Sequence, residues 1–269
     1  MDLKQLLKDI RERDYKIPEG VDAELLVQEM LCEIGSIDSE LRDDLIYFTF
    51  YQWIQRNALS PETKRNMLYT SLDDNHLFRG LGSSCEDTVF TRSFSVLISP
   101  LILECNFSRP FLTEEDIRHV FNQMCRYFRG ESDLRGYVEH KGWAHAVAHT
   151  SDAFETLVKC QGITKDDHLA IMDLILEKAQ VNTHYYVDGE DERMAEVINT
   201  IIQRNLLGDD PIVAWVQKAT KFKTIGKYPE DSIVRGNVRN LLRSVYFNTM
   251  RLNKDSKIPE AIVHALGPI

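Results

Sequence analysis

Hydrophobic residues recur every three or four positions along most of the chain, which is the spacing of one face of an α-helix. The first of these series ends at Pro18 and Gly20, and the second ends at Gly35. The alternation that is typical of β-strands is nearly absent and is limited to residues 183–187. Roughly eleven to thirteen helices account for the pattern, so the sequence predicts an all-α protein.

Several expected helices begin at residues that can cap a first turn. Ser60 precedes Pro61, while Thr113 and Thr164 precede acidic residues that suit the positive end of a helix dipole. Pro100 lies inside an apolar series over residues 88–105 and predicts a kink or break there. Further helices are expected over residues 41–54, capped by Asp38 or Ser39, and over residues 143–159, 190–205, 211–221 and 229–252.

The expected helices are joined by short loops, and such a row is typical of stacked antiparallel helix pairs. We therefore expect one all-helical domain over residues 1–269, built as a HEAT-like α-solenoid. No strict repeat period is visible in the sequence, which leaves an irregular helical domain as the alternative.

The composition is that of a globular protein, because 43% of the residues are hydrophobic and 28% are charged. The longest apolar-rich run, residues 94–103, is too short to span a membrane, and the charged N-terminus does not resemble an export signal. We therefore expect no membrane partner and a cytoplasmic location. No CxxC pair occurs, so free thiols are expected at Cys32, Cys85, Cys105, Cys125 and Cys160.

Charge is distributed unevenly, and the net charge is −10. Residues 1–50 hold 13 acidic and 6 basic residues, whereas residues 218–257 hold 10 basic and 3 acidic residues. Arg235, Arg239 and Arg243 recur every four positions and would form one stripe on a helix. This basic region could contact a polyanion, lie exposed to solvent, or face the acidic end of a second copy of the chain. Because the net charge repels phosphate backbones, we do not expect a nucleic acid partner.

Residues 131–159 are the densest cluster of candidate chemistry. On a helical wheel Trp143, Val147 and Phe154 share an apolar face, which we expect to lie against the core. His145, His149 and Asp152 fall on the opposite face, one turn apart. This spacing would let two imidazoles and a carboxylate reach one divalent metal ion, which could activate water. A ligand pocket without metal, or a structural polar network, would use the same residues.

Other polar residues extend the candidate ligand-binding set. Arg135 is followed by Gly136 and is suited to a carboxylate or phosphate contact, although an ion pair with Asp133 or Glu139 is the simpler interpretation. Arg92 lies in the apolar stretch FTRSFS, where an arginine usually has a buried acidic partner. The complete set of candidates is Arg92, Asp133, Arg135, His145, His149, Asp152, Glu190 and Arg193.

The runs DLRGYVEHKGWAHAVAHTSD (133–152), DTVFTRSFS (87–95) and GEDERMA (189–195) resemble a bacterial, largely Gram-positive family known as domain of unknown function 2785. The resemblance covers roughly residues 20–220, and GWAHAVAH is its most specific part. It implies an all-helical, repeat-like cytoplasmic domain, and it brings with it no activity, substrate or cofactor.

Three hypotheses about function follow from these patterns. The first is a binding or scaffold module, whose His-, Arg- and Asp-lined pocket would hold a small anionic ligand or a peptide. The second is a metal-dependent hydrolase with His145, His149 and Asp152 as ligands, and with Glu139 or Glu190 as the base. The third is a nucleic-acid binder that acts through the C-terminal basic helix.

Overall fold

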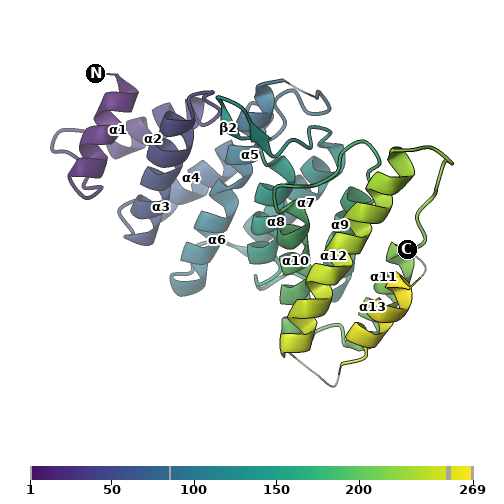
Figure 1. The fold of residues 1–269 in the computed structure, drawn as a ribbon. Helices are drawn as coiled ribbons and strands as arrows, with labels where there is room; N and C mark the ends of the chain where they lie inside the picture. The colour runs from purple at the N-terminus through teal and green to yellow at the C-terminus, as the bar shows by residue number, and fades with distance from the viewer. Residues whose placement is uncertain (1, 85, 253–255, 268–269) are drawn as a thin grey trace. The chain divides into compact units, whose positions relative to one another are not determined.

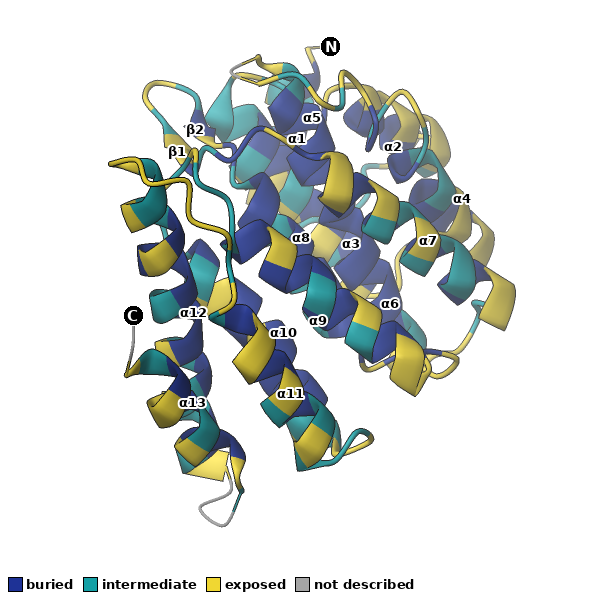
Figure 2. Ribbon diagram, turned by 90° about the vertical axis from the view of Figure 1, so that its right-hand side faces the viewer, coloured by how far each residue is buried: buried dark blue, intermediate teal, exposed yellow. Residues whose placement is uncertain are grey.

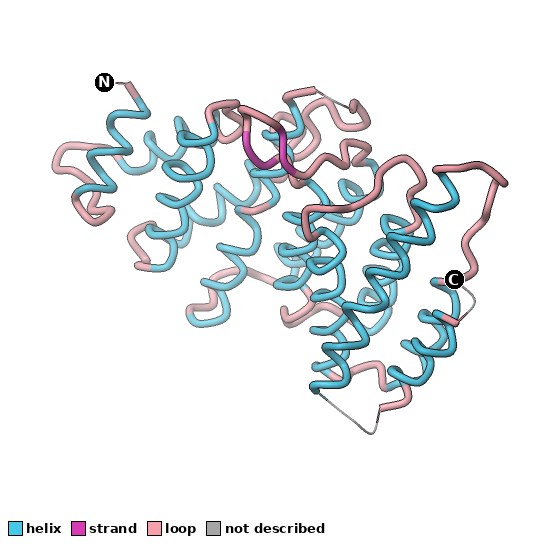
Figure 3. Tube along the Cα trace, in the orientation of Figure 1, coloured by secondary structure: helices cyan, strands magenta, loops and turns pink. Residues whose placement is uncertain are grey.

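The computed structural model describes residues 2–84, 86–252 and 256–267, and these are helical over most of their length (Figures 1 and 3). The all-α prediction is confirmed. The chain divides into two compact units, Met1–Ala153 and Phe154–Ile269, with the boundary inside helix α8. Within each unit most helices are buried along one side and exposed along the other (Figure 2), as the hydrophobic pattern requires, whereas the helical residues 89–96 are buried on all sides.

Unit 1 contains most of the helices and a small hairpin. Its elements are α1 (Leu3–Glu12), α2 (Ala23–Cys32), the π-helix η1 (Glu40–Tyr47), α3 (Phe48–Gln55), α4 (Pro61–Ser71), α5 (Thr88–Val96), α6 (Ile98–Ser108), α7 (Glu114–Gly130), β1 (Tyr137–Val138), β2 (Gly142–Trp143) and the first part of α8 (Ala146–Leu157). Unit 2 contains the end of α8, α9 (Lys165–Ala179), α10 (Glu190–Arg204), α11 (Asp209–Ala219), α12 (Glu230–Leu252) and α13 (Ile258–Leu266).

The predicted helix caps are confirmed. The hydroxyl of Ser60 accepts a hydrogen bond from the backbone N–H of Thr63 at 3.0 Å, and Pro61 is the first residue of α4. Thr113 and Thr164 each form a capping box, in which side chain and backbone bond reciprocally with an acidic residue three positions on. These contacts are local in sequence, which is why the residue pattern alone identifies them.

The helix expected over residues 41–54 forms as two joined segments, η1 and α3. Asp38 is its cap, because its Oδ1 accepts a hydrogen bond from the N–H of Leu41 at 3.2 Å. The first segment is a π-helix, a rare form that is frequently found at functional sites.

The apolar series over residues 88–105 forms α5 and α6, which are separated at Leu97. The break expected near Pro100 is therefore confirmed, three residues earlier. Within the described residues, Thr88–Ser108 is the one helical stretch long and apolar enough to cross a membrane, but 89% of its most apolar window is buried inside the structure. Its composition is accordingly that of a core element.

The structure differs from expectation in two places. Residues 137–143 form the hairpin β1–β2, whereas the sequence predicts a charged connector over 131–142 and a helix from Trp143. Residues 183–187, whose short alternation does not predict a strand, form a loop in which Tyr186 is buried between exposed neighbours. Helix α13 was not anticipated. Of the cysteines, Cys85 lies outside the described residues, and the other four are free thiols.

Candidate functional site

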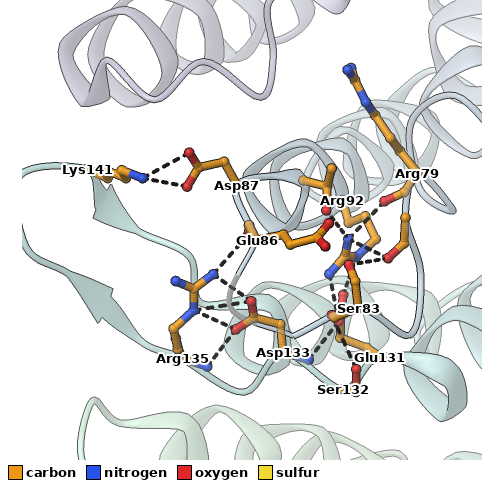
Figure 4. A network of polar contacts seen from close by, with 12 residues as sticks. Arg79, Ser83, Glu86, Asp87, Arg92, Glu131, Ser132, Asp133, Arg135 and Lys141 are labelled. Atoms are coloured by element: carbon orange, nitrogen blue, oxygen red, sulfur yellow. Dashed lines mark hydrogen bonds and ion pairs between the residues drawn. The ribbon is translucent and has the colours of Figure 1, made fainter.

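A buried ion pair organises the polar residues of unit 1 (Figure 4). The Arg92 side chain in α5 is 0% exposed, and its Nε and Nη2 donate to the carboxylate of Glu131 at 2.6 and 2.9 Å. Glu131 also accepts from the hydroxyl of Tyr127 and the N–H of Asp133, each at 2.9 Å. Burial and the negative charge of Glu131 raise the pKa of Tyr127 well above its usual value. Arg92 therefore has the buried acidic partner that the sequence predicted.

The arginines of this network hold the loop between α4 and α5. Nη1 of Arg92 donates to the backbone carbonyl oxygens of Arg79 and Gly80 at 2.8 and 3.2 Å. Arg135 pairs with Asp133, its Nη2 lying 2.6 Å from Oδ2, and also donates to the carbonyl of Glu86 at 2.9 Å (Figure 4). The Asp133–Arg135 interpretation is thus confirmed. Both guanidinium groups therefore have carboxylate and backbone partners within unit 1.

The hairpin β1–β2 rests on Arg42 of η1, which is 0% exposed. Its Nη1 and Nη2 donate to the carbonyls of Ser36 and Lys141 at 2.6 and 2.8 Å, so one side chain ties the hairpin turn to the start of the π-helix. Gly142 has φ +79°, and a Cβ atom there would lie 3.0 Å from Arg42 Nη2. A larger residue would therefore separate the hairpin from its support.

Asp43, next to Arg42 on η1, has a carboxyl group whose pKa lies above its usual value. Burial raises its pKa to about 6, although the Arg42 guanidinium, 2.7 Å away, opposes the shift. Burial also lowers the pKa of Arg42. A carboxyl group with a pKa near 6 can exchange protons at physiological pH.

An unbroken row of aromatic rings begins on the hairpin. Tyr137 contacts Trp143 edge-on at 5.1 Å between ring centroids, and Trp143 stacks on His145 at 4.5 Å with 19° between the planes. His145 then contacts His149 at 5.6 Å, and His149 contacts Phe94 at 5.0 Å. Tyr137 is 57% exposed and Trp143 39% exposed. The row therefore runs from the surface toward the buried α5.

Trp143 is the main departure from the predicted geometry of this segment. It belongs to β2 and is exposed, so its expected place on the apolar face of a helix is wrong. His145 precedes α8 with φ +46°, and its carbonyl accepts the hydrogen bond from the N–H of His149 at 2.9 Å. The hairpin ends at Trp143, and for that reason the helix begins three residues later than expected.

The three proposed metal ligands, His145, His149 and Asp152, are close in sequence, but their side chains are not arranged around a common metal position in the described structure. Nδ1 of His149 lies 3.2 Å from the carbonyl oxygen of Ser93, which a protonated Nδ1 can contact as a donor. Asp152 lies near Tyr47, whose pKa rises to about 12 through burial and this negative charge. Residues 2–84, 86–252 and 256–267 contain no group of three His, Cys, Asp or Glu side chains able to hold a metal ion. Metal binding therefore has no geometric support within those ranges.

The remaining candidates lie elsewhere. Glu139, proposed as a base, is at the tip of the hairpin with its side chain 87% exposed. Glu190 begins α10 in unit 2, is 1% exposed and accepts a hydrogen bond from the N–H of Asp188 at 3.0 Å. Arg193 follows on α10 and lines a surface hollow with Glu192 and Glu196.

Sequence reasoning missed the residues that build the exposed surface of this region. Tyr137 and Trp143 flank a Gly-containing turn, which is a hairpin signal, but strands of two residues are too short to show alternation. The support from Arg42 has no local signal, because 99 positions separate it from Lys141.

Comparison with known proteins identifies a family match that covers the site residues of unit 1. The family model described as "Protein of unknown function (DUF2785)" matches residues 77–247, which include the Arg92–Glu131 network, the hairpin and α8. No curated protein and no solved structure matches the chain. The matched span is well over half of the 269 residues, and the chain belongs to the DUF2785 family.

Proposed function

We propose that unit 1 is a peptide-binding module and that the aromatic surface of the hairpin, formed by Tyr137, Trp143 and His145, is its contact site. The observation that carries this proposal is the exposure of Trp143 in a fixed position. Leaving 39% of an indole side chain in water forfeits hydrophobic free energy. Stacking on His145 and support from Arg42 hold this costly exposed ring in one orientation.

Exposed, preordered aromatic rings are the usual anchors of protein–peptide contacts. Trp and Tyr provide a large contact area and lose little conformational entropy on binding, because each has only two side-chain torsions. The other two tryptophans serve the core, since Trp53 is 0% and Trp215 is 4% exposed. Trp143 alone among them is available to a partner.

The charge around the hairpin favours a basic or uncharged peptide. Arg92 and Arg135, the expected anion ligands, are engaged by Glu131 and Asp133. Unit 1 holds 26 acidic and 17 basic residues, and Glu139 is almost fully exposed at the hairpin tip. A lysine or arginine in the peptide would find both a carboxylate and the faces of aromatic rings. We therefore replace the small anionic ligand by a peptide with cationic residues.

The proposal is tested by selecting peptides from a random displayed library on the full-length protein. The Trp143→Ala variant serves for counter-selection, and Phe107→Ala removes an aromatic ring of similar exposure (46%) elsewhere in unit 1 as a matched control. We expect Lys- or Arg-containing peptides that bind wild type and Phe107→Ala alike and lose tenfold or more in affinity for Trp143→Ala. Peptides that bind Trp143→Ala equally well, or the absence of any selected peptide, would refute the proposal.

A further inference from the structure

Helix α12 in unit 2 presents a row of arginines without acidic residues between them. From Ser232 to Leu252 the helix contains no Asp or Glu. Arg235, Arg239 and Arg243 occupy successive turns, about 6 Å apart along the axis and about 40° apart around it. Arg235 and Arg243 are exposed, and Arg239 is half-buried. The three charges therefore share the outward side of α12, opposite the buried side seen in Figure 2.

These arginines are not paired with acidic side chains in the part of the chain that the structure describes. Within residues 2–84, 86–252 and 256–267 none of the three forms an ion pair, and the buried Nε of Arg239 has no hydrogen-bond acceptor. Two other basic residues of unit 2 are paired, since Lys218 lies 2.7 Å from Asp173 and Lys257 lies 3.3 Å from Asp210. The outward side of α12 is thus a surface of uncompensated positive charge.

An exposed aromatic ring is fixed beside the arginines. A Cβ atom on Gly236 would lie 2.2 Å from Cε2 of Tyr185, so only glycine lets this ring approach the helix so closely. Asn240 Nδ2 donates to the Tyr185 hydroxyl at 3.2 Å. The amide of Asn237, 1% exposed, accepts from the N–H of Tyr186 at 3.1 Å and donates to the carbonyl of His184 at 2.9 Å. Tyr185 itself remains 39% exposed.

We propose that this side of unit 2, comprising Tyr185 with Arg235, Arg239 and Arg243, binds single-stranded nucleic acid. Guanidinium groups on successive turns would contact successive phosphates, and a fixed tyrosine ring would stack on an unpaired base. Regularly spaced charge with an adjoining aromatic platform is the combination by which proteins bind single strands without sequence preference. A duplex keeps its bases stacked internally and offers no base face to Tyr185.

The local charge supports this partner despite the net charge of −10. The negative charge belongs mainly to unit 1, whereas unit 2 is nearly balanced with 15 basic and 16 acidic residues. The acidic residues of α10 that neighbour α12 are Glu192 and Glu196, which line a hollow with Ser244, Phe247 and Asn248. Glu196 accepts hydrogen bonds from Asn199 and Asn248 at 3.1 and 3.3 Å.

The acidic N-terminal end of a second copy suits the arginines less well. Several of its carboxylates already have cationic partners. Lys4 lies 2.5 Å from Asp38 and 2.8 Å from Glu40, Lys8 lies 2.9 Å from Glu40, and Arg56 lies 2.9 Å from Asp14. Contacts between copies would have to replace these ion pairs, whereas a phosphate backbone brings unpaired charges.

The test measures fluorescence anisotropy of labelled oligouridylate and oligodeoxythymidylate of about 16 nucleotides with the full-length protein. We expect salt-dependent binding, and a triple variant Arg235→Gln, Arg239→Gln, Arg243→Gln that reduces the slope of log affinity against log salt by about two. Tyr185→Ala should weaken binding about tenfold, while Tyr185→Phe, which keeps the ring, should bind nearly as wild type. Circular dichroism and melting curves verify that each variant is folded.

Matched controls separate this site from general polyanion binding. The triple variant Arg11→Gln, Arg13→Gln, Lys16→Gln removes the same charge from exposed positions of unit 1 and should bind as wild type. Inorganic polyphosphate has the charge without bases, and it should compete weakly per phosphate. Three results would overturn the proposal: equal competition by polyphosphate, equal loss in the unit 1 variant, or self-association or anionic-vesicle binding that depends on the α12 arginines while oligonucleotides do not bind.

Discussion

Neutralising Glu131 gives the most direct test of how unit 1 is held together. In Glu131→Gln the side-chain volume is kept, but the carboxylate that accepts from both Arg92 nitrogens is replaced by an amide. One of the two acceptor positions becomes an NH₂ group, which faces a donor nitrogen of Arg92 together with either the Tyr127 hydroxyl or the N–H of Asp133. The Arg92 guanidinium, 0% exposed, is left without the carboxylate that pairs with it directly.

The magnitude follows from this burial. Removing one partner of a buried ion pair typically costs about 3–5 kcal/mol, because the remaining charge stays desolvated. A surface pair would contribute less than about 1 kcal/mol. For a unit of this size the loss corresponds to a melting temperature lower by roughly 6–20 °C. The same change should release the loop whose carbonyls, at Arg79 and Gly80, are held by Nη1 of Arg92.

Two assays report these effects separately. Urea unfolding gives the free-energy change, and limited trypsin digestion with mass spectrometry gives the rate of cleavage after Arg79. We expect both a large destabilisation and faster cleavage in Glu131→Gln. Glu139→Gln removes a carboxylate that is 87% exposed, and it should change stability by no more than about 0.5 kcal/mol. A loss below about 1 kcal/mol in Glu131→Gln, with unchanged cleavage, would refute the assigned role of the ion pair.

Three further predictions concern single buried residues. Burial lowers the pKa of His168 below its usual 6.5, so the free energy of unfolding of unit 2 should fall as the pH drops below 6.5. Urea unfolding at several pH values should show a weaker dependence of this free energy on pH in His168→Gln. Burial alone would raise the pKa of Asp116, but hydrogen bonds from Thr113, Tyr69 and Arg65 outweigh it and lower this pKa from 3.8 to about 2. Asp116→Asn should therefore lower the free energy of unfolding by about 2 kcal/mol at neutral pH. The stabilisation by the wild-type carboxylate should disappear as the pH falls from 4 to 2, which urea unfolding at several pH values measures. Gly142→Ala should destabilise unit 1 by about 1–3 kcal/mol and weaken peptide selection, because the hairpin would shift away from Arg42.

The parts of the fold that were predictable from sequence depend on neighbouring residues. Ser60, Thr113 and Thr164 mark helix starts because their hydroxyl groups bond to N–H groups three positions away. The partner of Arg92 could be anticipated as acidic from its apolar surroundings, but its identity as Glu131, 39 positions away, could not. Long-range pairs leave no periodic signal in a single sequence.

The candidate site was mispredicted at the point where local and long-range contacts conflict. Residues 143–145 continue the apolar and small pattern of α8, so a helical wheel includes them. The structure instead places Gly142 and Trp143 in a hairpin, since Arg42 binds the carbonyl of Lys141 from a distant helix. His145 then adopts a positive φ, and α8 begins at the next residue, Ala146. The proximity of His145 and His149 was anticipated, whereas the exposure of Trp143 was not.

The two proposed binding surfaces share one structural principle. An exposed aromatic ring lies in a non-helical segment, and a buried polar side chain on a helix fixes that segment through its backbone. Arg42 does this for the hairpin that carries Trp143, and Asn237 does it for the loop that carries Tyr185. Burying an arginine or an asparagine is costly unless its hydrogen bonds are made. An apolar residue would fill either place at lower cost but could not bind a backbone carbonyl or N–H, and the ring would lose its fixed position. The fold alone does not require a buried Arg42 or Asn237, and their role in positioning Trp143 and Tyr185 explains why these polar side chains are buried.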